Sequence, residues 1–208
     1  MSAETVIATL RHARTRYNDE QRYAGSVDVP LSAAGVREAR RAAPQVASWR
    51  FEVLVTSGMR RTAQTARLLG GPRARIVPCA LCNERCFGIL ENRRWAEVRS
   101  IRPRILLIRV GDDWHTVNPP GAEPFEAVWE RAKKFRRFLF REFAGRRVLV
   151  ISHGVFLQMF HGLLRGVSCI EALARYPGNL ELNVFRFAGR RLAQEQTVKL
   201  ASGAGGRF

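Results

Sequence analysis

Thr5–His12 reads TVIATLRH, and this short stretch decides the fold class. Its first six residues form an apolar run of the length and β-branched character typical of a buried strand. The run ends abruptly at the polar pair Arg11–His12, so the expected strand delivers a cation and an imidazole at its carboxyl end. The run begins only a few residues into the chain and follows no basic region of the kind that opens a signal peptide. We therefore expect a cytoplasmic protein.

Further strand patterns alternate with helical patterns along the rest of the chain. Alternation of this kind predicts an α/β fold, a three-layer α/β/α sandwich with a mostly parallel sheet and helices on both faces. The expected strands are Thr5–Leu10, Phe51–Thr56, Arg75–Val77, Val148–Ile151, Val184–Phe187 and Ala193–Val198. The first expected helix is capped by Ser32 and runs to about Ser48. The other expected helices are Met59–Leu69, Phe125–Phe143 and Phe156–Leu164.

The domain organisation follows from the segments that fit neither pattern. Residues 78–124 contain prolines, cysteines and a mixed apolar and basic stretch, which predicts irregular structure. We expect one domain over residues 1–200, with a lid inserted at about 85–122, and a flexible, glycine-rich tail at 201–208. No apolar run approaches the roughly 20 residues that span a bilayer, so no membrane association is expected.

Polar residues end three of the expected strands: Arg11–His12, Thr56–Ser57 and Ser152–His153. Ligands of open α/β sheets bind at the carboxyl ends of the strands, where such residues can converge. The chain has only four histidines, so two of them at strand ends favour a functional site over chance. Arg61, just beyond the second strand, adds a planar guanidinium that can grip a phosphate with two hydrogen bonds.

Several motifs in the same order strengthen this interpretation. They are residues 11–18 (RHARTRYN), 22–35 (RYAGSVDVPLSAAG), 57–66 (SGMRRTAQTA), 84–88 (ERCFG), 119–123 (PPGAE) and 148–154 (VLVISHG). Together they resemble the histidine phosphatase superfamily, also called phosphoglycerate mutase-like, over residues 5 to about 165. The sequence departs from the family pattern at Ala13, where glycine is usual after the histidine.

The resemblance implies a phosphatase that hydrolyses phosphomonoesters through a phosphohistidine intermediate. Its implied catalytic residues are His12 as nucleophile, Glu84 as general acid and base, and His153; its implied phosphate-binding residues are Arg11, Asn18, Arg61 and His153. A neutral imidazole is required for attack, and neighbouring arginines favour it by repelling the imidazolium. Glu84 has an alternative role as a surface carboxylate paired with Arg85, and Asn18 has one as a turn cap.

No metal and no other cofactor is expected, because arginines can supply the positive charge that phosphoryl transfer needs. Three of the four cysteines cluster at Cys79, Cys82 and Cys86, but without a second pair or a nearby histidine they do not form a zinc pattern. Reduced thiols are the simpler interpretation.

Two other functions remain open at this point. A phosphohistidine that returns its phosphoryl group to a trapped product makes a mutase, although the predicted lid is short for retaining a product. The formal charge of +17 also permits a non-catalytic module that binds anions or nucleic acid on the same fold. We expect a small-molecule phosphate ester as the partner; nucleic acid is not favoured, although the charge leaves it open.

Overall fold

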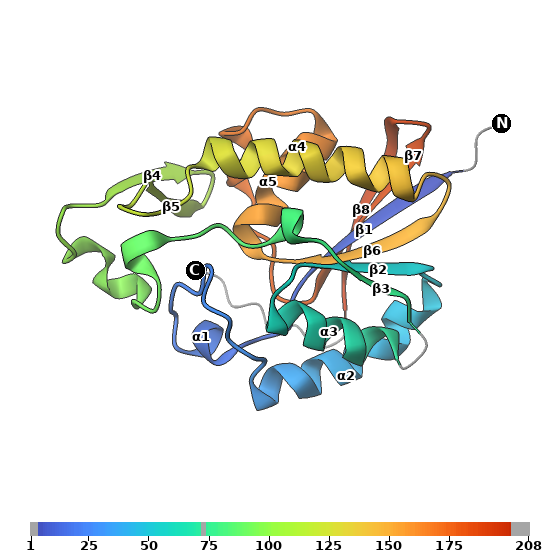
Figure 1. Ribbon diagram of the computed structural model, residues 1–208, viewed down its shortest axis with the longest axis horizontal. Helices are drawn as coiled ribbons and strands as arrows, with labels where there is room; N and C mark the ends of the chain where they lie inside the picture. Colours follow the sequence, from blue (N-terminus) through green and yellow to red (C-terminus); the bar gives the residue numbers. More distant parts are fainter. Residues whose placement is uncertain (1–3, 72–73, 201–208) are drawn as a thin grey trace.

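A six-stranded sheet forms the centre of the protein in a computed structural model that describes residues 4–71 and 74–200 (Figure 1). The strand order is β3-β2-β6-β1-β7-β8. The first four strands in this order run parallel to one another, β7 is antiparallel to β1, and β8 is antiparallel to β7. The bounds are β1 Thr5–Arg11, β2 Val53–Thr56, β3 Ile76–Pro78, β6 Arg147–Ser152, β7 Glu181–Ala188 and β8 Arg191–Lys199. The mostly parallel sheet predicted from the sequence is confirmed.

Helices cover both faces of this sheet. One pair, α2 (Ala33–Ser48) and α3 (Arg60–Gly70), lies below it in Figure 1, and the other pair, α4 (Phe125–Glu142) and α5 (Gly154–Arg165), lies above. Successive side chains of a strand point to opposite faces, so each strand contributes to two cores. In β1, Ile7 joins the cluster under α4 and α5, whereas Val6 and its alternating neighbours join the cluster over α2 and α3.

The start of α2 is fixed against the loop that follows β1. Ser32 caps the helix, as its position predicts, by accepting a hydrogen bond from the Gly35 backbone N–H at 3.1 Å. A Cβ atom at Gly35 would lie 2.0 Å from the carbonyl oxygen of Arg14. Glycine therefore lets the helix pack directly on the backbone just beyond His12, which holds that loop in place.

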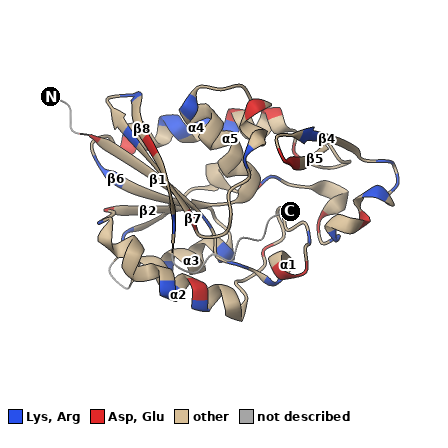
Figure 2. Ribbon diagram, turned by 180° about the vertical axis from the view of Figure 1, so that it is seen from behind, with Lys and Arg blue, Asp and Glu red and all other residues tan. Residues whose placement is uncertain are grey.

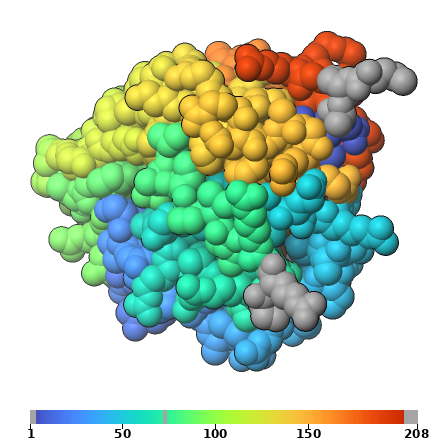
Figure 3. Space-filling view, turned by 45° about the vertical axis from the view of Figure 1, so that its right-hand side comes forward, coloured from blue at the N-terminus to red at the C-terminus, as the bar shows by residue number. Residues whose placement is uncertain are grey.

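Residues 78–124 are more regular than the sequence suggested, and the prediction of an irregular segment was wrong. They contain an antiparallel hairpin of β4 (Leu106–Val110) and β5 (Asp113–Val117), together with three short 3-10 turns, η1 Ala80–Cys82, η2 Gly88–Leu90 and η3 Trp95–Arg99. Gly111, with φ of 62°, turns the hairpin. The four-residue α1 (Arg16–Asp19) was also not foreseen. Figure 3 shows the green segment after β3 packed between the blue N-terminal part and the yellow α4.

The described part of the chain has no helix with the length and apolar character needed to cross a bilayer. Location in the cytoplasm, and a single domain over residues 1–200, stay predictions. The predicted flexible tail at 201–208 lies outside the described residues.

Candidate active site

The carboxyl ends of β1, β2 and β6 lie side by side, because these three strands are parallel and β6 pairs with both of the others. The backbone N–H of His12 donates to the carbonyl oxygen of Ser152 at 3.0 Å, which ties two of the strand ends together. The ring centroids of His12 and His153 are 5.2 Å apart. The structure thus brings together two histidines that are 141 positions apart in the chain.

The His12 ring is oriented by its own neighbour. Its Nδ1 lies 2.8 Å from the carbonyl oxygen of Ala13, which can only accept, so Nδ1 carries the proton and Nε2 holds a lone pair. His12 as a whole is 4% exposed and lines a cavity. Burial, and then the charges of Arg61 and Arg11, hold the pKa of His12 well below its ordinary value. The imidazole is therefore neutral. Burial lowers its pKa more than the neighbouring arginines do, although the sequence analysis named only the arginines.

Ala13 also shows why the departure from glycine is tolerated. Its methyl group belongs to the buried cluster over α2 and α3, and its N–H donates to Thr65 Oγ1 at 3.1 Å. Its carbonyl group orients the His12 ring, as described above. The extra methyl group packs into the core.

Arg11 is held by a segment that sequence reasoning missed. Its Nη1 donates to the carbonyl oxygen of Pro177 at 3.0 Å, and its guanidinium lies 4.8 Å from the centre of the Tyr176 ring. Asn179 supports the adjoining backbone by donating from Nδ2 to the His12 carbonyl oxygen at 2.7 Å. Among the described residues, the buried Nε of Arg11 has no hydrogen-bond partner. The Arg11 side chain lines the same cavity as His12.

Arg61 is anchored on both sides. Its Nη1 and Nη2 donate to the carbonyl oxygens of Val27 and Gly25, each at 2.8 Å, and its Nε donates to Nδ1 of His153 at 3.1 Å. Burial lowers its pKa to about 10, so it remains a cation at neutral pH. The guanidinium lines the same cavity as Arg11 and His12. It has five N–H groups, and two of them are left for a ligand after these three bonds.

His153 lies behind this arginine. It is fully buried, and its Nε2 donates to Ser57 Oγ at 2.7 Å while its Nδ1 accepts from Arg61. Burial is the main cause that holds its pKa well below the ordinary value. Both ring nitrogens are thus engaged, and the residue is absent from the cavity wall. The structure places His153 where it positions Arg61; direct phosphate binding by His153 stays a prediction.

Glu84 lies at the amino-terminal end of α5. Its Oε1 accepts from the backbone N–H of Phe156 at 3.1 Å and its Oε2 accepts from Val155 at 3.3 Å, as expected for a carboxylate at a helix N-terminus. The side chain is half-buried and lines the cavity. Oε1 of Glu84 also accepts from the backbone N–H of Arg85. The Arg85 guanidinium instead donates to the carbonyl oxygens of Glu123 and Thr116. The surface ion pair considered as an alternative is not formed.

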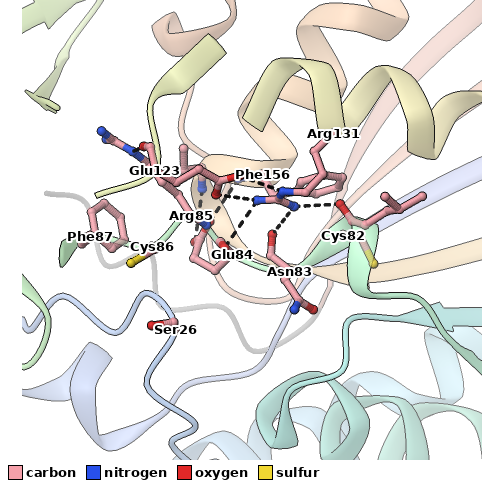
Figure 4. Close-up of polar contacts among 12 residues, drawn as sticks. Ser26, Cys82, Asn83, Glu84, Arg85, Cys86, Phe87, Glu123, Arg131 and Phe156 are labelled. Carbon is pink, nitrogen blue, oxygen red and sulfur yellow. Dashed lines mark hydrogen bonds and ion pairs between the residues drawn. The ribbon is translucent and has the colours of Figure 1, made fainter. Parts of the chain in front are cut away.

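A further arginine holds the loop that carries Glu84 (Figure 4). Arg131 on α4 donates from Nε and Nη2 to the two carboxylate oxygens of Glu123, at 2.9 and 2.8 Å. Its Nη1 donates to the carbonyl oxygens of Leu81 and Asn83, at 2.7 and 2.9 Å. No sequence pattern separates this arginine from the other basic residues of the helix.

Asn18 performs the turn-capping role that was considered for it. Its Oδ1 accepts from both the backbone N–H and the hydroxyl of Thr15, each at 3.0 Å, in the capping box of α1. The side chain also lines the cavity, and its Nδ2 donates no hydrogen bond to the described residues. Contact between this amide and a phosphate stays a prediction.

These side chains share one cavity of about 280 Å³. Its inner wall holds Arg11, His12, Asn18, Arg61 and Glu84, and its outer wall comes mainly from residues 85–122, which we call the outer segment.

No group of three or more histidine, cysteine or acidic side chains suited to a metal occurs within residues 4–71 and 74–200, and all four thiols are free. Lys and Arg positions elsewhere are spread over α2, α4 and the region of β4 (Figure 2).

The chain is similar to a set of known proteins. A family model described as "Histidine phosphatase superfamily (branch 1)" matches residues 7–198. A 2,3-bisphosphoglycerate-dependent phosphoglycerate mutase of Methylobacterium sp. (strain 4-46) is 30% identical over 175 residues, 79% of this chain and 83% of that protein. The uncharacterized phosphatase PhoE of Bacillus subtilis is 26% identical, over 79% of this chain and 78% of its own. YhfR of Bacillus stearothermophilus has a similar fold, with a TM-score of 0.78 at 21% identity, covering 91% of this chain and 94% of its own.

Proposed function

Because the chain belongs to the histidine phosphatase superfamily, branch 1, we propose that it is a phosphatase that hydrolyses phosphomonoesters through a phosphohistidine on His12. One observation carries the proposal. The Nδ1–H of His12 is fixed on the Ala13 carbonyl oxygen, so the neutral ring presents an Nε2 lone pair, and its cavity also contains the guanidinium groups of Arg11 and Arg61.

The first step would transfer the phosphoryl group to the protein. Nε2 of His12 attacks phosphorus as the bond to the ester oxygen breaks, and protonated Glu84 gives its proton to the departing alkoxide. Arg11 and Arg61 would hold the non-bridging oxygens, where negative charge is spread in the transition state. Both side chains line the cavity that contains His12, so their charge would lie close to these oxygens.

The second step would release phosphate. Water attacks the phosphorus atom, Glu84 takes a proton from that water, and the N–P bond breaks to return neutral His12. Water must reach the phosphohistidine for this step. The outer segment covers the cavity with one two-stranded hairpin and short turns, a cover small enough to favour hydrolysis over return of the phosphoryl group to a trapped product.

The proposal is tested by turnover of p-nitrophenyl phosphate by the wild type and by His12→Ala. We expect turnover and an acid-labile, alkali-stable phosphoenzyme in the wild type, and neither in the variant. Lys133→Ala, on the exposed face of α4, is the control and should behave as the wild type. Absence of turnover for every ester, with a folded protein, would leave only a binding role for the cavity.

A phosphoglycerate mutase is the second candidate, favoured by the 30% identity to a relative that carries that name. Incubation with 3-phosphoglycerate, with and without 2,3-bisphosphoglycerate, separates the two activities. A phosphatase releases inorganic phosphate, whereas a mutase converts the substrate to its 2-phospho isomer and releases little. We expect release.

A further inference from the structure

The outer wall of the cavity is largely apolar, unlike the inner wall that would hold the phosphate. Trp95 and Val98 come from η3, Leu107 from β4 and Trp114 from β5, and all four line the cavity. Aromatic side chains continue this surface, since the Tyr23 ring lies 5.1 Å from that of Phe87 and 6.5 Å from that of Trp95 between centroids. The part of the substrate that lies beyond the phosphate thus meets aromatic and aliphatic carbon.

The polar groups of this outer wall mostly have partners in the protein already. Asp113 accepts from the backbone N–H of Tyr176 at 3.2 Å. His115 donates from Nε2 to the Leu173 carbonyl oxygen at 3.0 Å. Hydroxyl groups of a polyol placed here would lose water and gain few new bonds, which costs free energy.

Arg22, Arg85 and Arg99 also line this wall, together with Asp112 and Thr116. Arg22 donates to Glu20 and to the Asn92 carbonyl oxygen. Arg85 keeps one buried nitrogen, Nη2, that has no partner among the described residues, and its guanidinium lies 3.8 Å from the centre of the Phe125 ring. The outer wall therefore combines a few charged side chains with aromatic and aliphatic ones.

We propose that the preferred substrates are phosphomonoesters whose alcohol carries an aromatic or bulky aliphatic group, rather than phosphates of sugars or glycerol. This proposal rests on the proposed phosphatase function. The cavity of about 280 Å³ matches the lower end of small-molecule sites, so it accommodates a phosphoryl group and one ring. Burial of that ring against Trp95, Leu107 and Trp114 would supply the binding energy.

A matched set of esters tests the proposal. Ethyl phosphate, 2-phenylethyl phosphate and glycerol 3-phosphate have primary alcohols as leaving groups, so differences in their hydrolysis report mainly on the outer wall. We expect kcat/KM for the phenylethyl ester to exceed that for the ethyl ester by about 10- to 100-fold. Glycerol 3-phosphate should be no better than ethyl phosphate.

Two variants of the hairpin assign the effect to particular residues. Trp114→Ala should reduce the preference for the phenylethyl ester by about tenfold. Leu106, on the other strand of the hairpin, is 62% exposed and does not line the cavity, so Leu106→Ala should leave the preference unchanged. Inhibition by 2-phenylethylphosphonate and ethylphosphonate gives a readout of binding that does not depend on chemistry, and the same ratio is expected there.

The outcomes separate this proposal from the function on which it rests. Equal kcat/KM for the phenylethyl and ethyl esters, or a preference for glycerol 3-phosphate, would overturn the substrate class while phosphatase activity stands. A preference that Trp114→Ala and Leu106→Ala reduce equally would overturn the assignment to the outer wall. A complete lack of turnover, including of p-nitrophenyl phosphate, would refute the phosphatase function and this proposal together.

Discussion

Nε of Arg61 donates a hydrogen bond of 3.1 Å to Nδ1 of His153, so a buried neutral histidine fixes the direction of a guanidinium in the candidate active site. An arginine cannot act as an acceptor, which means that Nδ1 of His153 is unprotonated and Nε2 carries the proton toward Ser57 Oγ. Both nitrogens of the second histidine are thus occupied in this structure, one of them by the arginine.

The first prediction concerns this contact. His153→Ala removes the acceptor for Arg61 and should lower kcat for p-nitrophenyl phosphate about 100-fold, because small errors in positioning cost about that much. His153→Asn keeps an acceptor oxygen near the former Nδ1 and should recover about tenfold of the loss. Steady-state kinetics with circular dichroism as a check on folding would measure both, and wild-type kcat in the alanine variant would contradict the positioning role.

Glu84→Gln tests the general acid. The amide keeps one oxygen, which can still accept from the backbone N–H of Phe156, but it loses the acceptor of Val155 and cannot give a proton to the leaving group. We expect kcat for an alkyl phosphate to fall about 10²- to 10⁴-fold, with a much smaller loss for p-nitrophenyl phosphate, whose leaving group needs no proton. The same substitution at the exposed Glu130 serves as control. Equal losses for the two esters would show that Glu84 is not the acid.

Arg131→Ala tests the loop that carries Glu84. The substitution leaves Glu123 and the carbonyl oxygens of Leu81 and Asn83 without their charged donor. We expect a loss of about 2–3 kcal/mol in the free energy of unfolding, measured by urea denaturation, together with a lower kcat. Arg141→Ala, at a solvated position on the same helix, should leave the unfolding midpoint unchanged. Equal midpoints for the two variants would mean that the Arg131 network adds no stability.

Buried histidines predict how stability depends on pH. Burial is the largest cause that lowers the pKa values of His12, His153 and His161 well below the ordinary value, so below pH ~6.5 the unfolded chain binds more protons than the folded one. Their contribution to stability is complete above this pH and is lost as the pH falls toward the folded pKa values. The slope reaches about 1.4 kcal/mol per pH unit for each histidine.

Denaturant titrations between pH 7.5 and 5.5 would measure this slope. His161 does not line the cavity and is bonded to Thr9 in the wild type. His161→Gln should reduce the slope by up to about 1.4 kcal/mol per pH unit. A slope that is unchanged in this variant, or a protein that becomes more stable on acidification, would contradict the prediction.

Metal removal should leave catalysis intact. Arg11 and Arg61 supply the positive charge in the cavity, and we expect the same p-nitrophenyl phosphate turnover before and after dialysis against EDTA. Strong inhibition that zinc or magnesium reverses would show instead that a metal ion takes part.

Much of the fold and the membership of the candidate site could be predicted from local patterns. The apolar run Thr5–Leu10 and its counterparts each specify a buried strand, because their periodicity and β-branched residues are local properties. Parallel neighbours then bring their carboxyl ends to one edge of the sheet, so Arg11, His12, Ser57 and His153 could be expected to meet. The hairpin around Gly111 was missed because its basic and apolar residues show no clean alternation.

The hydrogen-bond partners and protonation states of the polar groups at that edge depend on tertiary contacts. The proton of His12 lies on Nδ1 because the Ala13 carbonyl oxygen faces it, and His153 stands behind Arg61 because Ser57 and the arginine occupy its two nitrogens. Arg131 cannot be told from its basic neighbours until the chain places carbonyl groups from a distant loop around it. Local patterns predicted the strands of the central sheet and the polar residues that end them, because periodicity is a local property. Hydrogen-bond direction, burial and pKa depend on atoms far apart along the chain, which only packing brings into contact.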